Sequence, residues 1–144
     1  MFVQDDSLKK QPNETSNEHF KRLAELSAFA KDSRNNAKDE QEYQKYHNLL
    51  SNINEIVLKN EKLSRYVLSF LKSTYPTYYD DYEKRKVIIN CAYEEFLKNF
   101  SLYNGEFDIT TFAKRHLLHG AQKFIADISN KGSYDTELYN KVPF

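Results

Sequence analysis

Apolar residues recur at steps of three and four along most of the chain, the spacing that places side chains on one face of an α-helix. The clearest stripe runs into YVLSFLKSTYP, residues 66–76, and predicts an amphipathic helix. Its apolar side contains Leu63, Tyr66, Val67, Phe70, Leu71 and Thr74. Pro76 is expected to end this helix, because the residue before a proline is pushed out of the α region.

The same periodicity predicts two helices before this one. The first follows a cap at Ser16 or Asn17 and ends before the polar stretch KDSRNNAKDE. The second covers residues 39–59 and either runs on or breaks near Asn60. Residues 1–16 are polar and are expected to form an arm without a core of its own.

Two more helices follow a turn at TYYDD and are separated by a second turn at SLYNGEFD. Asp80 or Asp81 can cap the earlier helix, and Asp108 the later one, which ends near Asn130–Gly132. Short connections make the last three helices sequential antiparallel neighbours. We therefore expect an all-α protein: an N-terminal arm and helical extension over residues 1–60, a three-helix bundle over 61–131 and an irregular tail over 132–144.

Composition narrows the class of protein. Three glycines, three prolines and 15% aromatic residues favour helices over a turn-rich β fold. The 21 basic and 21 acidic residues cancel, so nothing indicates wholesale binding of nucleic acid. No apolar run approaches the ~20 residues that span a bilayer. The single cysteine excludes a disulfide or a cysteine-based metal cluster within the chain.

Candidate catalytic chemistry is sparse. His116 and His119 are three residues apart on one predicted helix face, which is a start for a metal site, but no second ligand cluster accompanies them. They read best as surface or boundary histidines, and no metal site is expected. Cys91 lies on an apolar stripe, as a buried inert thiol does. No glycine-rich phosphate loop is present, so the protein is not expected to be an enzyme.

Two features fit helix packing less simply. Lys84, Arg85 and Lys86 stand early in a helix, where the helix dipole prefers anions, with a mismatch of ~0.3–1 kcal/mol per charge. With Lys72 near the end of the preceding helix they are expected to form one basic patch, the alternative being an ordinary solvated face. Gly120 costs about 1 kcal/mol relative to alanine inside a helix and leaves room for either a neighbouring helix or a ligand chain.

The succession of YVLSFLKSTYP, YEKRKVIINCAYEEFLKN and TTFAKRHLLHGAQKF resembles the LYR family, the Complex 1 LYR proteins, over roughly Leu63 to Ile128. Phe70, Leu71 and Lys72 fall where the family carries Leu-Tyr-Arg, so the signature is degenerate at all three positions. Lysine keeps the charge of arginine but loses its bidentate fork. The basic triplet matches the opening of the family's second helix, Phe96 its aromatic position and Gly120 its small residue.

The resemblance implies a function. LYR proteins are small three-helix mitochondrial proteins that bind the mitochondrial acyl carrier protein through a basic patch, while its acylated 4'-phosphopantetheine arm inserts between the helices. It implies contacts from Lys72, Lys84, Arg85 and Lys86, and an acyl-chain groove formed by Phe70, Leu71, Phe96, Leu117, Gly120 and Phe124. The protein itself would bind no cofactor directly.

The implied role is a non-catalytic accessory subunit of a respiratory-chain complex, with complex I as the expected host, in the mitochondrial matrix or on the matrix side of the inner membrane. The N-terminal extension would then clasp neighbouring subunits. An LYR-type assembly factor for iron–sulfur cluster biogenesis or for the mitoribosome stays open. A more distant alternative is a helical nucleic-acid-binding module, because FDITTFAKRHLLHGAQKFI loosely resembles the core helix of bacterial sigma factors.

Overall fold

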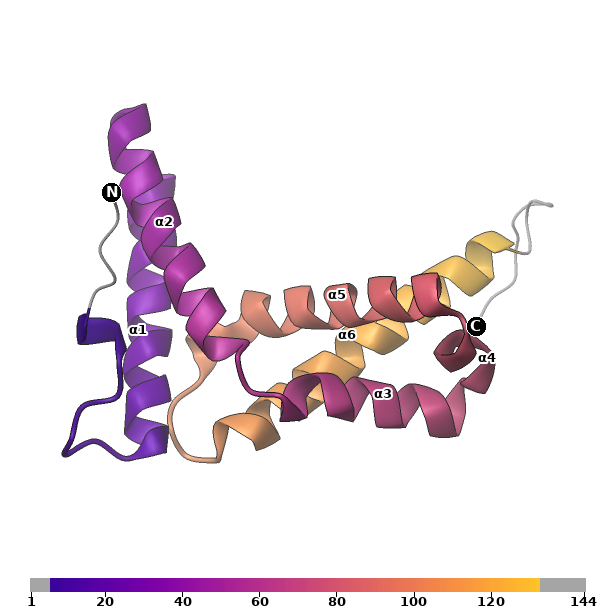
Figure 1. Ribbon diagram of the computed structural model, residues 1–144. Coiled ribbons are helices and arrows are strands. Elements are labelled where there is room, and N and C mark those ends of the chain that lie inside the picture. The colour runs from indigo at the N-terminus through magenta and orange to yellow at the C-terminus, as the bar shows by residue number, and fades with distance from the viewer. Residues whose placement is uncertain (1–5, 133–144) are drawn as a thin grey trace. The chain divides into compact units, whose positions relative to one another are not determined.

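The computed structural model describes residues 6–132, and over that range the protein is all-α, which confirms the predicted fold class (Figure 1). The helices are α1 (Ser16–Asn35), α2 (Glu40–Val57), α3 (Lys62–Thr74), α4 (Pro76–Asp80), α5 (Tyr82–Asn99) and α6 (Ile109–Gly132). There are also two short 3-10 helices: η1 (Asp6–Leu8) precedes α1, and η2 (Phe100–Leu102) follows α5. Apart from Gly132, the predicted C-terminal tail lies outside the described residues.

The chain forms two compact units, and each is described by itself. Unit 1 contains the residues up to Asn60 together with Leu97–Phe112. Unit 2 contains Glu61–Phe96 and the residues from Ala113 onward. α5 and α6 therefore contribute residues to both units. The sequence interpretation placed residues 97–112 in the three-helix domain, whereas their contacts group them with the N-terminal helices.

In unit 1, α1 and α2 run in opposite directions side by side (Figure 1). The predicted cap at Ser16 or Asn17 is wrong. Thr15 caps α1 instead, because its hydroxyl accepts from the Glu18 amide at 3.1 Å while the Glu18 carboxylate accepts from the Thr15 amide at 2.9 Å.

α1 also continues five residues into the polar stretch that was expected to interrupt it, ending at Asn35. Tertiary contacts hold this last turn. The Lys31 ammonium donates to the carbonyl of Leu97 at 3.4 Å, and the Arg34 guanidinium lies 3.2 Å from Nδ1 of His47 on α2. These contacts between distant positions override the weak helix propensity of Asp and Asn.

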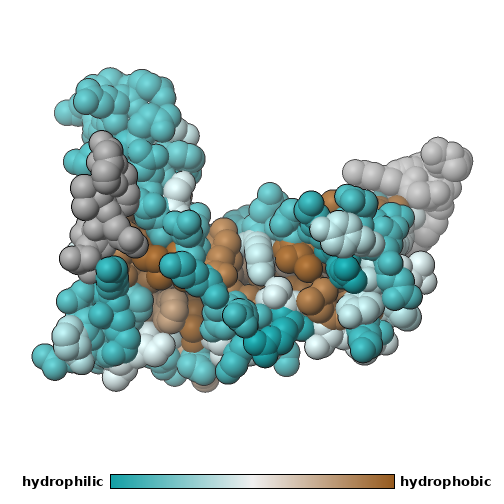
Figure 2. Space-filling view, viewed as in Figure 1, coloured by the Kyte–Doolittle hydropathy of each residue, from teal (hydrophilic) through white to brown (hydrophobic). Residues whose placement is uncertain are grey.

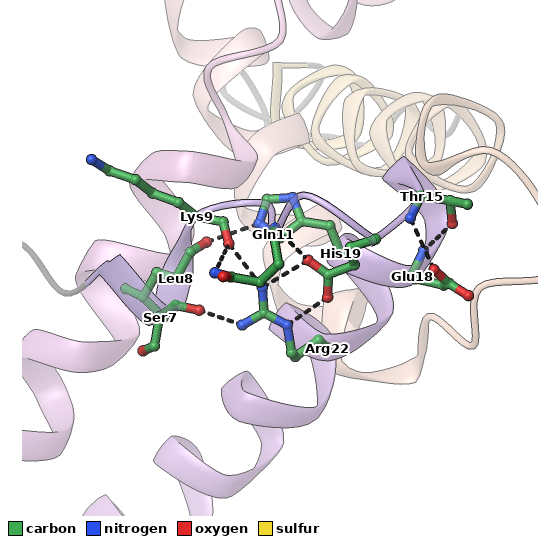
Figure 3. Close-up of polar contacts among 9 residues, drawn as sticks. Ser7, Leu8, Lys9, Gln11, Thr15, Glu18, His19 and Arg22 are labelled. Carbon is green, nitrogen blue, oxygen red and sulfur yellow. Dashed lines mark hydrogen bonds and ion pairs between the residues drawn. The ribbon is translucent and has the colours of Figure 1, made fainter.

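The N-terminal segment before α1 is docked, which corrects the expectation of an arm without a core. Leu8 is only 1% exposed, and its carbonyl accepts from Nε2 of the buried His19 at 2.8 Å (Figure 3). Arg22 donates to the carbonyls of Ser7 and Lys9 and makes a two-point contact with the carboxylate of Glu14. The two oxygens of Glu14 lie 2.7 and 2.9 Å from the guanidinium.

Unit 2 is a three-helix bundle of α3, α5 and α6, with α3 antiparallel to α5 and α5 antiparallel to α6 (Figure 1). Pro76 ends α3 as predicted, at the Tyr75 cap. The predicted turn at TYYDD is instead the short helix α4, which begins on Pro76 because the fixed φ of proline suits the first helical position. Asp81 caps α5, accepting from the Lys84 amide at 3.1 Å.

At Gly120 the helices α5 and α6 of unit 2 lie close together. A Cβ placed there would lie 2.7 Å from Cβ of Glu95, 3.0 Å from Cα of Ala92 and 3.0 Å from the carbonyl oxygen of Cys91. The space that glycine leaves is therefore occupied by α5. This is the tight helix packing that the sequence allowed as one of two interpretations.

We predict that Gly120→Ala destabilises the protein. The added methyl gains about 1 kcal/mol of helix propensity, but overpacking against backbone costs about 1–3 kcal/mol. The difference between these terms is a net loss of up to about 2 kcal/mol in urea unfolding. Gln122→Ala, at an exposed position of the same helix, is the control and should stay within about 0.5 kcal/mol of the parent. Equal stability of the two variants would contradict the steric account.

We predict that acid releases the N-terminal segment. The hydrogen bond from Arg22, with a further one from the Gln11 amide, lowers the pKa of Glu14 from 4.5 to about 2. Because the folded value lies below the ordinary one, this contribution to stability is complete above pH 4.5 and is lost as the pH falls toward 2. Amide NMR shifts of Ser7–Glu14 should report the opening. Glu14→Gln should weaken docking of the segment at neutral pH and flatten its dependence on acid. Glu55→Gln, at an exposed position of α2, is the control and should change neither the docking nor its pH dependence.

Candidate functional site

The four cations predicted to form a basic patch lie among tyrosine rings where α3, α4 and the start of α5 meet in unit 2. We call this group the cation–tyrosine cluster. Its members are Lys72, Tyr78, Tyr79, Tyr82, Lys84, Arg85 and Lys86.

The ring of Tyr79 joins cations from two helices. Nζ of Lys72 on α3 lies 5.9 Å from the ring centroid, and the guanidinium carbon of Arg85 on α5 lies 5.4 Å from it. Arg85 also donates to the backbone carbonyl of Tyr79 at 2.9 Å. The ring of Tyr79 on α4 is therefore a shared neighbour of Lys72 and Arg85.

The other two cations are arranged around neighbouring rings. Nζ of Lys86 lies 5.8 Å from the centroid of Tyr82, whose ring is also 5.6 Å from the guanidinium of Arg85. Nζ of Lys84 lies 5.7 Å from the centroid of Tyr78. The side chains of Lys72, Lys84 and Lys86 are exposed, and Arg85 is half-buried.

The cluster is cationic but not uniformly so. Asp80, Asp81 and Glu83 lie on the same stretch of chain and leave the four cations with a net charge of about one. Each exposed cation–π contact contributes only ~0.5–1 kcal/mol. These contacts therefore orient the cations while leaving their charged ends available to an anionic partner.

The tyrosines were not part of the sequence interpretation, which treated TYYDD as a turn. One signal for them was available. Tyr78 and Tyr79 precede the basic triplet by one to two helical turns, so a helical reading of residues 76–80 places aromatic rings beside Lys72 and Arg85.

The residues proposed to form an acyl-chain groove lie within unit 2. Leu71, Phe96, Leu117 and Gly120 are buried, whereas Phe70 and Phe124 are half-buried. Figure 2 shows apolar residues along α5 and between α5 and α3 on the face drawn. Since α5 occupies the space beside Gly120, a chain could enter here only by moving helices apart.

The two histidines of α6 lie near an acidic residue of α5. Nε2 of His119 is 4.0 Å from Oε2 of Glu95, whose other oxygen is 3.3 Å from Nζ of Lys123. Burial lowers the pKa of His116, with the charge of Arg115 acting in the same direction. No group of three His, Cys, Asp or Glu side chains within residues 6–132 could hold a metal ion. Burial, together with Glu94 and Asp127, raises the pKa of Cys91 and disfavours its thiolate.

Among the described helices, none is long and apolar enough to cross a membrane. No protein-family model, curated protein or solved structure matches this chain. The residues of unit 2 that bear most directly on function are Lys72 and Arg85, whose charged groups lie 5.9 and 5.4 Å from the Tyr79 ring centroid.

Proposed function

We propose that this chain is a non-catalytic LYR-type accessory subunit that binds mitochondrial acyl carrier protein and anchors it to a larger mitochondrial assembly, a respiratory-chain complex such as complex I. It would act in the mitochondrial matrix or on the matrix side of the inner membrane. The sequence resemblance suggested this role, and the geometry of unit 2 is compatible with it.

One observation carries the proposal: Lys72 and Arg85, on different helices, share the ring of Tyr79. Two cations that contact one aromatic ring suit an acidic helix better than lysines without such a contact do, because less side-chain entropy is lost on binding. Lys84 and Lys86 extend the same surface and would steer an acidic partner toward it.

The apolar part of the proposal concerns the carrier's acylated 4'-phosphopantetheine arm. Phe70 and Phe124 are half-buried apolar side chains beside a core that contains Leu71, Phe96 and Leu117. An acyl chain between the helices would remove its own apolar surface from water, which contributes about 25 cal/mol per Å². Its contacts with the helices would also replace the helix–helix contacts that are lost when the helices separate. Acylated carrier protein should consequently bind more tightly than the form without an acyl chain.

The test compares how tightly the parent chain and a charge-reversed variant bind acylated acyl carrier protein, first by co-purification and then by calorimetry. Lys72→Glu, Arg85→Glu and Lys86→Glu combined should weaken binding at least about tenfold, or about 1.4 kcal/mol, because like charges would then face each other. Binding of the parent chain should also weaken as salt is raised. The measurement is a dissociation constant by calorimetry at two salt concentrations.

The matched control reverses three exposed lysines of unit 1: Lys38→Glu, Lys45→Glu and Lys59→Glu. It produces the same change in net charge, so a specific contact predicts that it binds like the parent. Thermal unfolding of both triple variants checks that the fold survives, since Arg85 also holds the Tyr79 carbonyl. Equal weakening in both variants would reduce the proposal to a net-charge effect, and unchanged binding in the first would remove the cluster from the interface.

The host assembly can be identified separately. Native mass spectrometry of the complex isolated with this chain would name its neighbours and reveal any phosphopantetheine adduct on a carrier protein. Respiratory-complex subunits together with a carrier protein are the expected result. Iron–sulfur biogenesis or mitoribosomal proteins would favour the assembly-factor alternative, and co-isolated nucleic acid would favour the helical nucleic-acid-binding alternative.

A further inference from the structure

Tyr82 is the most accessible hydroxyl-bearing ring of the cation–tyrosine cluster. Its side chain is 60% exposed, whereas Tyr78 and Tyr79 are half-buried. Among the tyrosines that the structure describes, only Tyr43 is also exposed, at 38%, and its ring stacks on His47 and lies beneath Arg34. A modifying enzyme would therefore reach Tyr82 before the other described tyrosines.

Two cations lie near Tyr82 and would pair with an anionic group attached to its hydroxyl. The guanidinium of Arg85 lies 5.6 Å from the centre of its ring, and the ammonium of Lys86 lies 5.8 Å from it. Lys86 is exposed, so its long side chain can turn from the ring toward a group attached to the ring oxygen. Arg85 donates one N–H to the Tyr79 carbonyl and keeps other N–H donors for such a group. Arginine pairs especially well with phosphate, since its planar fork makes two parallel hydrogen bonds.

The net charge of the cluster is so small that one phosphate would reverse its sign. Four cations face three carboxylates on the same stretch, so the surplus is about one positive charge. A phosphate monoester carries about −1.5 to −2 at neutral pH. One phosphate would thus turn a weakly cationic surface into a weakly anionic one. Asp80, Asp81 and Glu83 flank Tyr82 in the sequence and supply the charge pattern by which a kinase with a basic substrate groove would select it.

We propose that Tyr82 is a phosphorylation site and that its phosphate pairs with Arg85 and Lys86, which switches the cation–tyrosine cluster from cationic to anionic. In the reaction, the phenolic oxygen of Tyr82 attacks the γ-phosphorus of ATP bound to a tyrosine kinase. A new O–P bond forms, the bond from the γ-phosphorus to the bridging oxygen breaks, ADP leaves and the phenolic proton passes to a base of the kinase. The regulatory consequence, release of an acidic partner, rests on the proposed function, whereas the site itself does not.

The first experiment maps the site on the full chain. The protein is incubated with ATP, Mg²⁺ and a purified tyrosine kinase that accepts acidic-flanked sites, and the products are located by tandem mass spectrometry. Of the nine tyrosines within residues 6–132, Tyr82 should be the dominant acceptor, and Tyr82→Phe should remove most of the phosphate incorporated into that part of the chain. Phosphate on other tyrosines with Tyr82 unmodified would overturn the assignment.

The second experiment tests the pairing, without any partner protein. The phosphorus NMR signal of phosphotyrosine 82 should titrate at a lower pH in the parent than in a chain carrying Arg85→Gln and Lys86→Gln, because nearby cations favour the dianion. Lys38→Gln with Lys59→Gln is the matched control and should titrate like the parent. Identical titration of all three proteins would overturn the pairing.

The third experiment measures binding of acylated acyl carrier protein before and after phosphorylation. The parent should lose at least tenfold in affinity on treatment, whereas Tyr82→Phe should bind equally well before and after treatment. If the untreated parent fails to bind, the proposed function fails and the first two experiments still decide the site. If the untreated parent binds and phosphorylation at Tyr82 leaves its affinity unchanged, the switch is overturned while the proposed function stands.

Discussion

The core of unit 2 depends on how closely α6 lies against α5 at Gly120. The nearest backbone atoms of Ala92 and Cys91 would be only 3.0 Å from a Cβ at this position, so the missing carbon sets the spacing of the two helices. Phe96 and Leu117 are fully buried at that spacing. A wider separation would leave gaps around their side chains, and packed interiors lose dispersion contacts steeply when gaps of that kind open. One glycine therefore governs the fit of much larger neighbours.

The position of α5 also determines which cations lie together at the start of this helix. Arg85 can share the ring of Tyr79 with Lys72 only while the start of α5 stays beside the end of α3, and the short helix α4 supplies the ring between them. The aromatic rings restrict these cations through weak contacts and do not neutralise them, as a paired carboxylate would. The three carboxylates of the same stretch do reduce the net charge, so the surface offers a partner a surplus of about one positive charge.

Two signals contained in a few neighbouring residues, a proline stop and an aspartate cap, predicted the structure correctly. Pro76 ends α3 and Asp81 caps α5, because each acts on the backbone within four residues of itself. The cap of α1 was missed although Thr15 and Glu18 form a recognisable capping box.

The docking of the N-terminal segment and the last turn of α1 depend on Arg22, Lys31 and Arg34, whose partners are 13 or more residues away in several cases. Which side chains meet over such separations is decided by packing, which local periodicity does not encode. The tyrosines around Lys72 were missed for a related reason, since they become neighbours only once residues 76–80 are helical.

The contacts of Arg22 influence how the N-terminal segment opens. A single guanidinium holds carbonyls of Ser7 and Lys9 and the carboxylate of Glu14, so these points of attachment share one anchor on α1. Leu8 adds a second attachment, since its side chain is buried and its carbonyl accepts from His19. His19 and Arg22 are three residues apart on α1 and so lie on one face of that helix, which favours opening of both attachments together. Ser7–Glu14 should therefore behave as a separate cooperative folding unit, whose opening free energy lies below that of global unfolding.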